Sequence, residues 1–113
     1  MSKTDKAKFE FVLQMISEIE SYLLDFKSIT TLLSNTMGFN ATLMNLLQIG
    51  ETLNKVDKEI LKKWSIFDES RGAYNVRNFI AHDYEGVRKS IIEDILRYHL
   101  ENLKDKISDI LGK

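Results

Sequence analysis

Apolar residues recur along the chain at alternating intervals of three and four residues. This spacing places them on one face of an α-helix. The longest run predicts a first helix from Lys3 to about Ile29. Its stripe consists of Phe9, Val12, Ile16, Ile19, Leu23 and Phe26. A second helix is expected from about Ala41 to Val56, with Asn40 as its N-cap. Its stripe consists of Leu43, Leu46, Gly50 and Leu53.

Three further helical segments are predicted in the second half of the chain. Residues 58–64 favour a short helix, and a third principal helix then runs through Tyr74 and Phe79, with Gly86 closing the turn that follows. The candidates for its cap are Asp68, Glu69 and Ser70. A last long helix reaches the carboxyl end, with Leu111 at the edge of its stripe. That stripe consists of Ile92, Leu96, His99, Leu103, Ile107 and Ile110.

The fold class follows from these periods. Four principal helices, a short fifth one and no strand pattern predict an all-α, four-to-five-helix up-and-down bundle. His99 falls on the apolar stripe of the last helix and is therefore interpreted as structural. Gly50 falls inside a helix, where glycine costs about 1 kcal/mol relative to alanine, so we interpret it as a place where another helix packs closely.

Composition adds limits on size, location and partners. The 113 residues fit one compact domain, 1–113, and the chain has no cysteine. Residues 1–8 are polar and lack an apolar signal core, so a cytoplasmic location is expected. The uncharged stretch 28–50 is as long as a membrane span but rich in Ser, Thr and Asn, so we interpret it as a helix end, a loop and a helix start. With 16 basic and 17 acidic residues the net charge is −1, and any RNA contact must be local.

The stretch from Arg77 to Tyr84 carries the candidate chemistry. It reads Arg-Asn-Phe-Ile-Ala-His-Asp-Tyr and sets a permanent cation, an acid/base group and a phenol within eight residues. Arginine can hold a phosphate through two parallel hydrogen bonds, and histidine can move a proton near neutral pH. Arg77 and His82 lie about 140° apart on an ideal helix, so these residues and Tyr84 converge only if the helix ends near His82 or the arginine side chain reaches across.

Each of these residues also has a structural interpretation. Arg77 can pair with a neighbouring acid, His82 can interact with carbonyl groups at a helix end, and Tyr84 can pack in the core. The whole string favours function over these separate explanations. A metal centre is not expected, because two histidines seventeen residues apart and no thiols give no recognisable ligand spacing.

The string resembles the HEPN superfamily and, within it, the HepT-like toxins of toxin–antitoxin pairs, which carry Arg-x4-His-x-Tyr with Asn after the Arg. The resemblance continues in Ile49-Gly50-Glu51 and in Trp64, and so covers most of the chain. One departure is the missing proline before that tryptophan, because this chain has no proline at all. Glu51 faces solvent, pairs with Arg77 across the bundle, or does both, and the resemblance favours the pair.

The resemblance implies a homodimeric, metal-independent endoribonuclease with no cofactor and its active site in the dimer cleft. Arg77 would then stabilise the transition state and His82 would transfer protons, so that RNA is cut through its own 2′-hydroxyl. Asn78 would orient the phosphate or His82, and Tyr84 would position substrate or supply a proton. The implied antitoxin is a small nucleotidyltransferase that binds the toxin and modifies Tyr84 with AMP.

Two alternatives stay open at this point. Small helical bundles also serve as non-catalytic, substrate-binding or accessory subunits beside nucleotidyltransferases, and Arg77 and His82 would then bind a nucleotide or a partner's phosphate. The near-neutral charge fits this role better, whereas the complete string favours the toxin. The third reading is an entirely structural helical domain.

Overall fold

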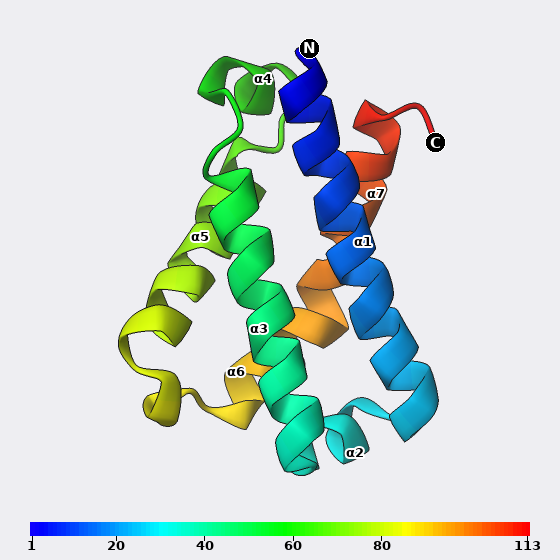
Figure 1. Ribbon diagram of the computed structural model, residues 1–113, viewed down its shortest axis with the longest axis vertical. Coiled ribbons are helices and arrows are strands. Elements are labelled where there is room, and N and C mark those ends of the chain that lie inside the picture. The colour runs from blue at the N-terminus through cyan, green and yellow to red at the C-terminus, as the bar shows by residue number, and fades with distance from the viewer.

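The computed structural model describes all 113 residues as an all-α bundle without strands, which confirms the predicted fold class. Helices α1 (Lys3–Phe26), α3 (Thr36–Leu53) and α5 (Phe67–His82) alternate in direction, and a C-terminal arm runs back along them (Figure 1). The arm consists of α6 (Lys89–Asp94), a π-helical turn (Ile95–His99) and α7 (Leu100–Ile110). The connections contain α2 (Ile29–Ser34), α4 (Lys58–Lys63) and a 3-10 turn (Tyr84–Gly86).

The first helix is shorter than predicted. It ends at Phe26, because Lys27 adopts a left-handed backbone conformation with φ of 71°. Ser28 then starts α2, and its hydroxyl accepts a hydrogen bond from the backbone N–H of Thr31 at 3.0 Å. The apolar stripe continues across this break, so periodicity alone did not reveal it.

Helix α3 begins five residues earlier than predicted, and Asn40 is not its N-cap. The cap is Asn35, whose Oδ1 accepts a hydrogen bond from the N–H of Gly38 at 2.9 Å. The first turn of α3 then packs on α2, since a Cβ on Gly38 would lie 2.8 Å from a methyl carbon of Leu32. The uncharged stretch 28–50 is therefore α2 and most of α3 rather than a helix end, a loop and a helix start. No helix of the chain is long and apolar enough to cross a membrane.

The third principal helix lacks the predicted side-chain cap. Helix α5 starts at Phe67, directly after the fully buried Ile66, and no side chain accepts a hydrogen bond at its start. Asp68 and Glu69 lie inside the first turn instead. Their negative charges interact favourably with the positive end of the helix dipole there. Gly86 ends the 3-10 turn after α5, as expected, and its N–H donates to the carbonyl of Asp83 at 3.0 Å.

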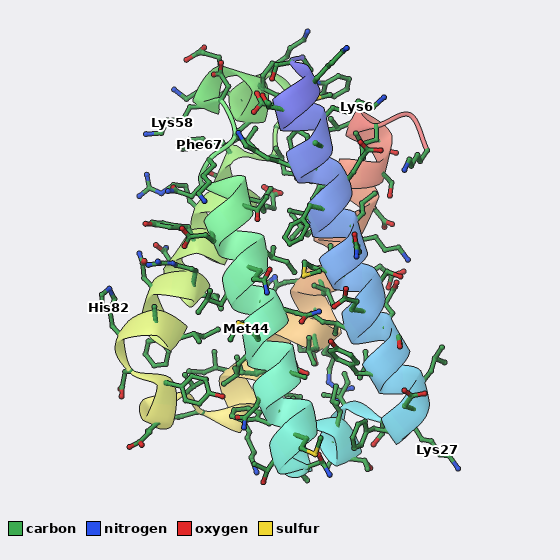
Figure 2. The ribbon with its side chains drawn as sticks, viewed as in Figure 1. Lys6, Lys27, Met44, Lys58, Phe67 and His82 are labelled. Carbon is green, nitrogen blue, oxygen red and sulfur yellow. The ribbon has the colours of Figure 1, made fainter.

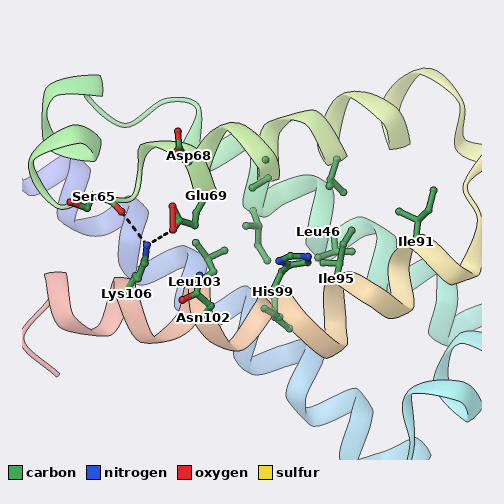
Figure 3. Close-up of a pocket in the computed structure, with 15 residues that line it drawn as sticks. Leu46, Ser65, Asp68, Glu69, Ile91, Ile95, His99, Asn102, Leu103 and Lys106 are labelled. Carbon is green, nitrogen blue, oxygen red and sulfur yellow. Dashed lines mark hydrogen bonds and ion pairs between the residues drawn. The ribbon is translucent and has the colours of Figure 1, made fainter.

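His99 is not a core residue, which corrects the sequence prediction. The π-helical turn from Ile95 to His99 contains one residue more than an α-helical turn and so shifts the buried stripe by one position. Leu100 therefore packs in the core with 6% of its surface exposed, whereas His99 is exposed. His99 lines a pocket of about 720 Å³ between α5 and the C-terminal arm (Figure 3).

The core is one cluster of 22 buried apolar residues contributed by all the principal helices. A buried amide also joins α1 to α3, because Asn45 donates to the carbonyl of Met15 at 3.1 Å and to Glu18 at 3.2 Å. Lys104 joins α7 to α1 through a 2.8 Å ion pair with Glu20, and this hydrogen-bonded carboxylate raises the pKa of Lys104. These contacts join α1, α3 and α7 into the framework that supports α5.

Candidate active site

The position of α5 is set by its close packing against α3 at Gly50. A Cβ at residue 50 would lie 2.7 Å from the Cβ of Arg77 and would overlap the carbonyl oxygen of Ala73. Only glycine allows the two backbones to approach this closely. The prediction that Gly50 marks a tight helix contact is confirmed, and the contact brings the residue after it, Glu51, beside Arg77.

Arg77 is held in one orientation by three neighbours. Its Nε donates a hydrogen bond to Glu51 Oε2 at 2.6 Å, and its Nη1 donates to Asn78 Oδ1 at 3.0 Å. The guanidinium carbon also lies 5.6 Å from the ring centre of Tyr74. The ion pair that we expected between Glu51 and Arg77 is therefore present, and Glu51 remains 38% exposed as well.

Part of the guanidinium is still available to a ligand. A guanidinium has five N–H groups, and Glu51 and Asn78 use one each. The remaining three include both hydrogens of Nη2, which with Nη1 form the fork that fits two oxygens of a phosphate. About a quarter of the Arg77 side chain is exposed, so this fork can be reached from solvent.

His82 is the last residue of α5 and is exposed. Its side chain points away from the bundle (Figure 2), and its imidazole makes no hydrogen bond or ion pair within the chain. Five residues of helix separate His82 from Arg77 by about 7.5 Å along the axis and about 140° around it. The two side chains therefore leave α5 in widely different directions.

Tyr84 lies beyond the end of α5 and contacts another helix. Its hydroxyl donates to Asn40 Oδ1 at 2.5 Å, which ties the 3-10 turn to α3. Its side chain is 45% exposed. The structure thus brings Arg77, Asn78 and Glu51 into one hydrogen-bonded group, whereas Tyr84 is held by Asn40 and His82 stands alone.

Two residues of this site were missed by sequence reasoning. Tyr74 lies three positions before Arg77, so helical spacing alone places the ring beside the guanidinium. Asn40 was assigned to a helix cap, and it holds Tyr84 from 44 residues away. A single sequence carries no signal for a contact of that range.

Comparison with known proteins bears on the whole bundle. A family model described as Ribonuclease HepT-like matches residues 12–110, which include every residue of the site. No solved structure matches the chain.

Proposed function

The chain belongs to the HepT-like ribonuclease family, and from this and its site we propose that it is a metal-independent endoribonuclease toxin. One observation carries the proposal. Arg77 is oriented by Glu51 and Asn78 with a free fork of donors, and five residues later the same helix ends in an exposed histidine that has no partner in the chain. This is the pairing of a phosphate binder with a proton carrier that RNA cleavage needs.

RNA supplies its own nucleophile in this reaction. A base removes the proton of a 2′-hydroxyl, the oxygen attacks the adjacent phosphorus, and the bond from phosphorus to the 5′-oxygen breaks. An acid then protonates the departing 5′-oxygen. The products are a 2′,3′-cyclic phosphate and a 5′-hydroxyl, with no water or other reactant consumed. DNA lacks the 2′-hydroxyl and is expected to survive.

The side chains have separate tasks in this proposal. The free N–H groups of Arg77 bind two phosphate oxygens and stabilise the charge that grows on them in the transition state. Asn78 orients Arg77 with its carbonyl oxygen and still has an amide NH2 for the phosphate. His82 transfers the protons, since a neutral imidazole accepts one and its protonated form donates one.

We propose a homodimer as the active form. The base and the acid act on opposite sides of the transferred phosphorus, and each chain offers one histidine at the site. Two-fold pairing would bring a second His82 to the same cleft. The exposed, unpartnered imidazole supports this arrangement. We expect a dimer in light scattering, and an active protein that stays monomeric at assay concentration would refute it.

The proposed antitoxin is a nucleotidyltransferase that attaches AMP to Tyr84. The hydroxyl is accessible, because the side chain is 45% exposed and its only hydrogen bond is to a surface residue, Asn40. An attached adenylate would add bulk and negative charge beside the motif. It would block phosphate entry and compete for Arg77.

The test is incubation of the purified protein with mixed RNA in EDTA, followed by analysis of the product ends. Wild type should leave cyclic phosphate ends. His82→Ala should lose cleavage, whereas His99→Ala removes the other histidine of the chain and should keep it. Arg77→Ala and Arg77→Lys should also lose cleavage, because neither retains the fork.

Cleavage that survives in folded His82→Ala or Arg77→Ala at an unchanged rate would refute the assignment. No cleavage by unmodified, dimeric wild type would favour the alternative, a non-catalytic accessory subunit of a nucleotidyltransferase.

A further inference from the structure

One stripe of α5 carries no acidic side chain, although Asp68 borders it. With Arg77 at 0° and 100° per residue, His82 lies at about 140° and Arg71 at about 120°. Asp68 lies at about 180°, at the edge of this stripe, whereas the Glu69 carboxylate points into the pocket toward Lys106 (Figure 3). The stripe itself therefore carries the cation of Arg71 and no acid, with the Glu51-paired Arg77 beside it.

This face carries two aromatic rings, an arginine, an asparagine and a histidine. Its residues follow at steps of four, three, four and four, which keeps them on one stripe of about 22 Å. The stripe consists of Phe67, Arg71, Tyr74, Asn78 and His82. Arg71 lies over the ring of Phe67 at 5.9 Å, just as Arg77 lies over the ring of Tyr74. Arg71 has no ion-pair partner in the chain, so its charge remains available to a ligand.

The stripe continues past the start of α5 to an exposed tryptophan. Trp64 is 42% exposed, with Lys63 over its ring at 6.0 Å, and Lys62 lies over Phe67 at 5.5 Å. Ser65 has a left-handed backbone with φ of 55°, and the turn it makes separates Trp64 from the fully buried Ile66. The indole therefore lies outside the core, where burial does not explain it.

We propose that Trp64, Lys62, Lys63, Phe67, Arg71 and Tyr74 form a binding track for single-stranded RNA that leads to the site at Arg77 and His82. The proposal rests on the proposed ribonuclease function. Phe67 is the first residue of α5 and His82 is its last, so one helix spans this part of the track. Trp64 would stack on an unpaired base, and the cations would follow the phosphates.

The chemistry of the track favours unpaired RNA over a duplex. Stacking on an aromatic ring needs a base with an exposed face, and duplex bases offer none along the strand. The track also resolves the problem of net charge, because a protein of charge −1 has no global field that attracts RNA. A local group of lysines and arginines held over aromatic rings meets the need.

Binding is best measured in a His82→Ala background, so that the RNA is not cut. The probe is a fluorescent single-stranded RNA of about 12 nucleotides, within the range of single-strand binding sites, read by anisotropy over a salt series. Trp64→Ala should weaken binding roughly tenfold or more, and Trp64→Phe should restore most of it. Arg71→Gln should lower the slope of log affinity against log salt by about 0.7.

The matched controls lie on other parts of the surface. Tyr98→Ala removes an aromatic side chain that is 67% exposed on the C-terminal arm, and Lys27→Gln removes one charge at the far end of α1 (Figure 2). Both should bind like the parent. Thermal unfolding of every variant ensures that lost binding is not lost folding.

Unchanged affinity and salt slope in Trp64→Ala and Arg71→Gln would overturn the track, as would equal binding of a duplex. If the same variants lost nucleotidyltransferase binding but still bound RNA, the surface would be assigned to a protein partner instead. Cleavage by wild type is scored separately. If RNA binds through the track but wild type does not cleave it, the ribonuclease function is refuted and the track is kept. If wild type cleaves RNA and the track substitutions change neither binding nor cleavage, the track is refuted and the ribonuclease function is kept.

Discussion

Gly50→Ala tests the contact on which the site depends. In an open helix position this substitution stabilises a protein by up to about 1 kcal/mol, because alanine has the better helix propensity. At residue 50 the added methyl group would overlap the carbonyl oxygen of Ala73 and lie 2.7 Å from the Cβ of Arg77. A backbone carbonyl cannot rotate aside as a flexible side chain can, so α5 as a whole must move away from α3.

The expected magnitude follows from two opposing effects. Overpacking of this kind costs about 1–3 kcal/mol, and the upper part of the range applies where backbone is the obstacle. Subtraction of the propensity gain leaves a net loss of about 1–2 kcal/mol. The same movement would pull Arg77 from Glu51, now 2.6 Å away, so catalysis should fall more than stability does.

Gly72→Ala is the matched control. Gly72 also lies inside a helix, but a Cβ there would meet no atom within 4 Å. We expect it to be neutral or stabilising by up to about 1 kcal/mol, so the two variants should differ by about 1–3 kcal/mol. For a chain of this size that corresponds to roughly 5–15 °C in melting temperature.

Both variants should be melted at the same protein concentration, since dimerisation makes the melting temperature concentration-dependent. Equal stability of Gly50→Ala and Gly72→Ala would refute the argument that the approach of α5 to α3 requires glycine.

Two further predictions concern the residues around the motif. Glu51→Ala should lower RNA cleavage about 10- to 100-fold through loss of Arg77 orientation, yet cost at most about 1 kcal/mol of stability, because the pair is partly exposed. Parallel kinetics and melting would test this, and proportionate losses in both would contradict it. Tyr84→Phe should fold normally and gain no AMP mass on co-expression with the nucleotidyltransferase, whereas Tyr98→Phe should still gain it. Adenylation of Tyr84→Phe would place the acceptor elsewhere.

The sequence predicted those features that local spacing determines. Apolar periodicity located the principal helices, and an interior glycine correctly indicated a close helix contact at Gly50. The end of α5 at His82 was one of the two alternatives that the geometry of the motif left open. These inferences need only positions a few residues apart, where helix geometry fixes the outcome.

The sequence predictions were wrong where the backbone conformation of one residue, or one contact between residues far apart in the sequence, determines the structure. Lys27 ends the first helix by adopting a left-handed backbone conformation. Lysine is not a residue type that predicts this conformation. The π-helical turn moves His99 off the buried stripe, and an ideal period of 3.6 cannot represent the extra residue. Asn40 bonds Tyr84 across 44 positions, a pairing that only the folded chain defines.

The three faces of helix α5 have different roles in this molecule. One face lies against α3, where Gly50 sets the distance and Glu51 fixes Arg77. A second borders the pocket and directs the Glu69 carboxylate to Lys106. The third carries aromatic rings, Arg71 and His82, with Asp68 at its edge. Segregation of charge around one helix thus gives a chain of net charge −1 a surface that is suited to a polyanion, without making the whole protein basic.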